Sequence, residues 1–170
     1  AGASVDFGLP VGSELKELIR NKLSIEFDSL ANQSRGSKII GRSLLDSFPS
    51  TSEGIAVVNK HIQAGWEIEK AMPLAISIDN FIHAHSHDEK IVTMGKMAIV
   101  ECILDAERSS SLFQQTNGKG YIDFSALKSH WYGEFCRILT EDVTIDDIES
   151  LFSNVSFINF NYDRCLEYYI

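Results

Sequence analysis

The feature that most constrains this chain is its opening stretch, AGASVDFGLPVG, a turn of small residues that leads into a predicted helix. Where no side chain larger than alanine intervenes, backbone N–H groups can approach an anion closely, and the positive end of the following helix strengthens the attraction. Apolar residues recur at helical spacing from Leu15 to Phe27, so we expect an amphipathic helix over 13–27 with Ser13 as its N-cap. This combination predicts a phosphate-binding turn.

A second informative stretch lies near the other end of the chain. Val155 to Phe160 is short, apolar and partly β-branched, which predicts a buried strand. Asn161 and Asp163 follow it directly, and in a parallel α/β sheet such a strand end and a glycine turn meet at one crevice. An alternative is that both residues only form an Asx-turn and cap the helix that starts near Arg164.

The segment between these two stretches is predicted to be helical. Its clearest helix runs from Asp88 to about Arg108, and a shorter one from Ser52 is expected to end at Gly65. We therefore expect an α/β fold in which 1–27 and 151–170 contribute to a partial Rossmann-like parallel sheet. The all-helical insertion, 28–150, would cap the crevice. Because the chain begins inside the turn and ends soon after a strand, we expect it to be truncated at both ends.

Composition excludes several classes of function. The net charge of −9 and the pI near 4.9 argue against nucleic-acid or anionic-membrane binding, since both need a basic face. We find no signal peptide and no apolar run long enough to span a bilayer, and the three cysteines are widely spaced. These features predict a cytoplasmic protein with no membrane or direct nucleic-acid partner.

Histidines occupy alternate positions at 83, 85 and 87, and on an extended segment such histidines could bind one metal ion together. No second cluster of ligands accompanies them, so a solvated loop before the Asp88 helix is the preferred interpretation. We therefore expect no metal site.

Two motifs resemble those of sirtuin-like domains. Ala1-Gly2-Ala3-Ser4, followed by Phe7-Gly8-Leu9-Pro10, is similar to the opening motif of that family. Phe160-Asn161-Tyr162-Asp163-Arg164 resembles the second motif of its prokaryotic, defence-associated branch. The two motifs cover less than a fifth of the chain, but they occur in the correct order.

The resemblance implies a domain that binds NAD and cleaves it to nicotinamide and ADP-ribose, within bacterial anti-phage defence. By position, Ala1, Gly2, Ala3 and Ser4 would line the pyrophosphate and adjacent ribose, and Pro10 would lie at the nicotinamide end. Asn161 would be the catalytic amide, and Asp163 would hold the carboxamide. The family's catalytic histidine is expected beyond Ile170, so these residues alone should be nearly inactive. We also expect a homo-oligomer with fused or associated defence domains.

Departures from the family pattern keep other functions open. Phe160 stands where protein-deacylating sirtuins carry glutamine, and Val11-Gly12-Ser13 replaces their Asp-Phe-Arg, which argues against a deacylase. A non-catalytic sensor of NAD or ADP-ribose is the principal alternative. A purely structural helical module is another.

Overall fold

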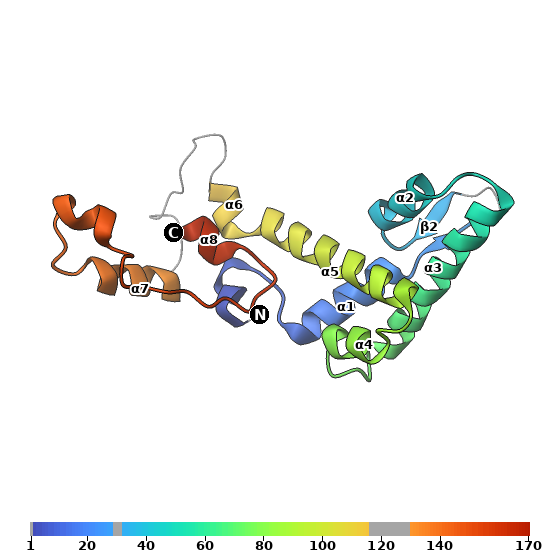
Figure 1. Ribbon diagram of the computed structural model, residues 1–170, viewed down its shortest axis with the longest axis horizontal. Helices are drawn as coiled ribbons and strands as arrows, with labels where there is room; N and C mark the ends of the chain where they lie inside the picture. The colour runs from blue at the N-terminus through green and yellow to red at the C-terminus, as the bar shows by residue number, and fades with distance from the viewer. Residues whose placement is uncertain (1, 29–31, 116–129) are drawn as a thin grey trace. The chain divides into compact units, whose positions relative to one another are not determined.

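A computed structural model describes residues 2–28, 32–115 and 130–170 (Figure 1). The chain forms two compact units. One comprises Pro10–Cys102, and the other combines Ala1–Leu9 with Ile103–Ile170. We call them the continuous unit and the terminal unit.

The continuous unit contains helices and a small hairpin. Its elements are α1 (Gly12–Leu23), β1 (Glu26–Phe27), β2 (Gln33–Arg35), α2 (Lys38–Ser47), α3 (Ser52–Ala71), α4 (Ile78–Ala84) and the first part of α5 (Glu89–Ser109). The two strands pair antiparallel. α1 and α2 both pack against α3.

The core of the continuous unit is apolar and fully buried. Ile19 and Leu23 on α1, Ile68 on α3 and Met94 on α5 have no solvent exposure. The helices approach closely at Gly65, where a Cβ would lie 3.1 Å from Met94 Cε and 3.6 Å from the Leu23 carbonyl oxygen. A side chain at this position would press on the end of Met94, so glycine favours close packing here, and it does not end the helix.

The terminal unit is built from short elements. They are the 3₁₀ helix η1 (Gly2–Phe7), the last part of α5, α6 (Ser111–Gln115), α7 (Trp131–Thr140), the 3₁₀ helix η3 (Ile145–Ser150) and α8 (Cys165–Tyr169). In the part of this unit that the structure describes, these elements share a small buried core, which consists of Phe7, Leu9, Leu112, Tyr132 and Cys165.

The prediction of a partial Rossmann-like parallel sheet is wrong. Among the described residues the only sheet is the antiparallel β1–β2 hairpin, and the protein is largely helical. The segment 155–160 forms no strand, and Ile158 and Phe160 are 80% and 91% exposed. A short apolar run forms a strand only where a neighbouring strand pairs with it. In the described residues no strand pairs with 155–160.

Other elements follow the sequence more closely. Helices predicted near 52 and from Asp88 to Arg108 are present as α3 and α5, although α3 continues past Gly65 to Ala71. The first helix ends at Leu23, and its N-cap is Val11 rather than Ser13. Apolar periodicity identifies helices well, but the exact cap depends on local backbone geometry.

Candidate functional site

The two motif segments meet inside the terminal unit. Ser4 lies in η1 and is completely buried, and Asp163, just before α8, is 5% exposed. The Ser4 hydroxyl donates to Asp163 Oδ1 at 2.7 Å, and Asn161 Nδ2 donates to Ser4 Oγ at 3.4 Å. Three residues predicted to share a site are thus in direct contact, although no parallel sheet brings them together.

Asp163 also has a structural role. The same oxygen, Oδ1, accepts a hydrogen bond from the backbone N–H of Cys165 at 3.1 Å, within the first turn of α8. Asn159 Oδ1 accepts from the backbone N–H of Asn161 at 2.9 Å, an Asx-type contact. Of the turn-and-cap alternative that the sequence left open, the contact of Asp163 with the start of α8 is present, whereas the Asx-type contact is made by Asn159 and not by Asn161.

Tyr132 completes the polar cluster. It is the second residue of α7, is 1% exposed, and its hydroxyl lies 3.3 Å from Ser4 Oγ. Burial raises the pKa of the Tyr132 phenol, so the hydroxyl stays protonated at neutral pH. We refer to Ser4, Tyr132, Asn161 and Asp163 as the polar cluster.

The buried thiol of Cys165 borders the polar cluster. Burial, followed by the negative charge of Asp163, raises the pKa of this thiol to about 12. A thiol with such a pKa remains protonated and is a poor nucleophile. Cys165 therefore serves as a packing residue, as its place in the small core suggests.

The remaining predicted binding residues are distributed differently. Ala1 lies outside the described residues, and Gly2 is an exposed residue at the start of η1. The Ala3 carbonyl accepts a hydrogen bond from Trp131 Nε1 at 2.7 Å, which ties the opening turn to α7. Pro10 is the first residue of the continuous unit.

A pocket of about 370 Å³ lies on the terminal unit. Its lining residues are Glu107, Ser110, Leu112, Phe113, Arg164, Cys165, Glu167 and Tyr168. Arg164 makes an ion pair with Glu107, with Nη2 and Oε2 3.2 Å apart, and this contact raises the pKa of the guanidinium. None of the predicted site residues that the structure describes lines this pocket, and the link between the pocket and the polar cluster is α8, which begins two residues after Asp163.

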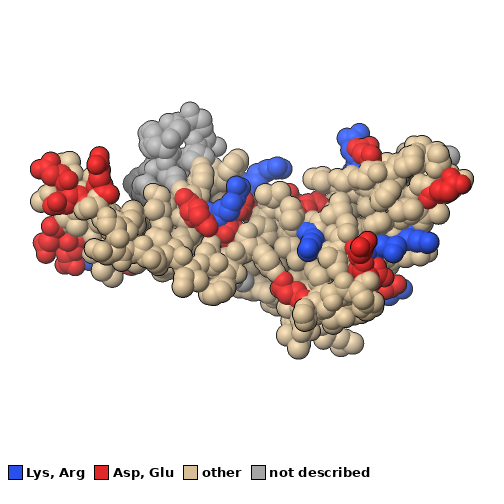
Figure 2. Space-filling view, viewed as in Figure 1, with Lys and Arg blue, Asp and Glu red and all other residues tan. Residues whose placement is uncertain are grey.

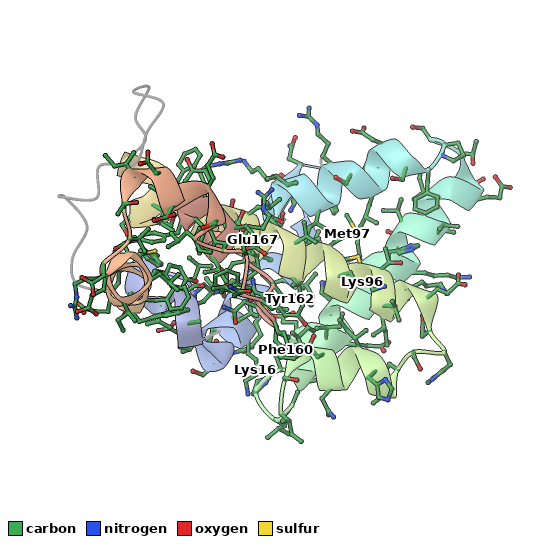
Figure 3. All side chains as sticks on the ribbon, turned by 60° about the vertical axis from the view of Figure 1, so that its left-hand side comes forward. Lys16, Lys96, Met97, Phe160, Tyr162 and Glu167 are labelled. Carbon is green, nitrogen blue, oxygen red and sulfur yellow. The ribbon has the colours of Figure 1, made fainter. Side chains whose placement is uncertain are left out.

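The outer surface of the terminal unit is acidic and partly apolar. Between Ile138 and Asp163 the sequence has no basic residue or histidine, and acidic side chains gather beyond α7 in the view of Figure 2. Figure 3 labels Phe160 and Tyr162 on the segment before α8, and Glu167 on α8. Phe160 and Tyr162 are largely exposed, so neither contributes to the core.

Two classes of site are not found in the described part of the chain. Residues 2–28, 32–115 and 130–170 contain no group of three or more histidine, cysteine or acidic side chains arranged to hold a metal ion. None of the helices within these ranges has both the length and the apolar character that a membrane span requires.

Comparison of the chain with protein-family models, with curated proteins and with solved structures gives no match.

Sequence reasoning misses Tyr132 as a member of the polar cluster. Its neighbour Trp131 stands out by helical apolar spacing, whereas a tyrosine on a predicted amphipathic helix gives no sign of which partner its hydroxyl will find. The partner, Ser4, is 128 residues away in sequence. Only the folded chain brings these two hydroxyl groups together.

Proposed function

We propose that this chain is part of a sirtuin-like NAD glycohydrolase and that the polar cluster is its candidate site. One observation carries the proposal. Two motifs that lie at opposite ends of the chain meet through the contacts of Ser4 with Asp163 and Asn161. The proposal draws no support from the overall fold, because the sheet expected from the resemblance is not formed.

The chemistry of the cluster suits cleavage of an N-glycosidic bond. Breaking this bond develops positive charge on the ribose, so a site gains by presenting oxygen dipoles or a water molecule to the anomeric carbon. Asn161, which is partly exposed, can orient the ribose or water with its amide. Asp163 can hold the carboxamide of the leaving nicotinamide, since a carboxylate accepts N–H hydrogen bonds strongly.

The experiment is nicotinamide release from NAD by the full-length protein and its Asn161→Ala variant. We expect a loss of about 100-fold or more in kcat/KM, the size seen when an enzyme loses a group that stabilises transition-state charge. Asn154→Ala is the matched control, because Asn154 is an exposed amide outside the polar cluster. Its turnover should equal that of the wild type.

The outcomes separate the proposed function from its alternatives. Normal turnover by Asn161→Ala would show that the site assignment is wrong. Calorimetric binding of NAD without nicotinamide release would instead identify a sensor. Reaction that depends on an acylated lysine peptide would identify a deacylase.

A further inference from the structure

The hydrogen bonds of Ser4 determine which groups of the polar cluster donate and which accept. A serine hydroxyl has one hydrogen to donate and two lone pairs to accept with. Ser4 gives its hydrogen to Asp163 Oδ1, so the contact at 3.3 Å with Tyr132 must run from the tyrosine hydroxyl to Ser4 Oγ. Asn161 Nδ2 supplies the second accepted bond, and the capacity of the Ser4 hydroxyl is then filled.

This arrangement limits the kind of ligand group that the cluster can meet. Binding a phosphate needs donors, and the single hydrogen of Ser4 is already used by a carboxylate. A phosphate beside Asp163 would also face a like charge. The hydrogen bonds from Ser4 and from the Cys165 backbone N–H both go to Oδ1 of Asp163, and the Cys165 thiol also interacts with this carboxylate, so Oδ2 is the oxygen better placed for a further neutral N–H or O–H donor.

Tyr132 is held firmly enough to orient Ser4. Its ring packs against those of Phe7 and Tyr169, with centroids 5.0 and 5.3 Å away, and these two rings also contact each other. The preceding residue, Trp131, bonds the Ala3 carbonyl, next to Ser4. Two consecutive residues at the start of α7 therefore fix the position of the opening turn.

We propose that Tyr132 is a positioning residue of the candidate site: through Ser4 it orients the Asp163 carboxylate, so that Oδ2 receives a neutral donor of the ligand, an amide or a ribose hydroxyl. This inference rests on the proposed function, which already places the nicotinamide end of NAD at Asn161 and Asp163; what it adds is the role of Tyr132. Hydrogen bonds in such a chain reinforce one another, because each donor is polarised by the next acceptor.

The test is a double-mutant cycle on nicotinamide release by the full-length protein, using Ser4→Ala, Tyr132→Phe and the double variant. Tyr132→Phe should raise KM for NAD about fivefold, the loss expected from one neutral hydrogen bond, with kcat nearly unchanged. Adding Tyr132→Phe to Ser4→Ala should have no further effect, because Tyr132 acts only through Ser4. Tyr169→Phe is the control, since it removes a hydroxyl from the same aromatic group.

Each outcome decides the inference. Additive effects of the two substitutions, or an equal rise in KM for Tyr169→Phe, would overturn it and indicate a packing role for Tyr132. If Tyr132→Phe does not fold, Ser4→Ala alone decides, because it removes the same link without disturbing the aromatic rings; an unchanged KM would then overturn the proposal. A wild-type protein that releases no nicotinamide would overturn the proposed function and this inference with it, whereas failure of the inference alone leaves wild-type turnover intact.

Discussion

The two units of this protein are stabilised in different ways. The continuous unit buries long aliphatic side chains from several helices, including Ile19, Leu23 and Ile68. Among its described residues, the terminal unit has a buried core cluster of five, next to which the polar residues Ser4 and Asp163 are also buried. A small core gains little from apolar burial, so directional hydrogen bonds must specify the arrangement of the terminal unit.

Helix α5 supplies a glutamate to each unit, and these two residues show the difference. Glu101 is 8% exposed and contacts Lys22 at 2.7 Å and the hydroxyl of Ser37. Glu107 pairs with Arg164, whose side chain is 74% exposed. Glu101 joins α5 to α1 and to the N-cap of α2 in a largely buried setting, whereas the pair of Glu107 with Arg164 reaches the surface, where water screens it.

The largest expected effect tests this contrast. Glu101→Ala should lower the free energy of unfolding by about 3 kcal/mol, because it removes a largely buried carboxylate that accepts hydrogen bonds from both Lys22 and Ser37. Glu107→Ala should cost much less. Urea denaturation of both variants provides the measurement, and equal losses would show that the two ion pairs do not differ as their burial implies.

The next largest expected loss of stability comes from replacing a glycine of the continuous unit. Gly36 follows β2 with a φ of +75°, and a Cβ there would lie 2.7 Å from the Ile25 backbone. Gly36→Ala should therefore destabilise the protein by about 2 kcal/mol through left-handed strain and the clash, as measured by thermal or urea unfolding. No destabilisation would mean that the connection between β2 and α2 can relax freely.

Gly2, in the terminal unit, provides the glycine to compare with Gly36 of the continuous unit. A Cβ at Gly2 would meet no atom within 4 Å, so Gly2→Ala should leave unfolding unchanged. If the proposed function is right, the added methyl group should nevertheless weaken NAD binding, which calorimetry on the full-length protein can measure. Unchanged binding would remove Gly2 from the candidate site.

The smallest expected effect is a dependence on pH that is confined to the terminal unit. His130 is the N-cap of α7, and its Nδ1 accepts the Gly133 N–H at 3.0 Å. Burial lowers the pKa of His130, although Asp6 opposes the shift, so the folded state favours the neutral ring. The cap therefore contributes stability above the ordinary pKa of about 6.5, and this contribution is lost as the pH falls through the lowered value.

Hydrogen exchange at Gly133 would detect this loss. Protection should fall by an amount equivalent to less than about 1 kcal/mol between pH 7.5 and pH 5. His130→Asn keeps an N-cap acceptor that does not titrate, so its protection should change little over this range. A pH response that persists in this variant would assign the effect to another group.

The sequence by itself determined the helices and the small residues of the opening turn. The periodic apolar residues of α3 and α5 predict these helices directly, because helical burial depends on spacing within one segment. The order of the two motifs also suggested that Ser4, Asn161 and Asp163 would lie together.

Only the tertiary structure decided the sheet and the members of the polar cluster. The segment 155–160 has the composition of a strand, but strand formation requires a partner, which local sequence cannot specify. The contact of Tyr132 with Ser4 likewise joins residues 128 positions apart. Helical periodicity is a local property of the chain, whereas strand pairing and side-chain hydrogen bonds over such separations arise only when the whole chain has folded.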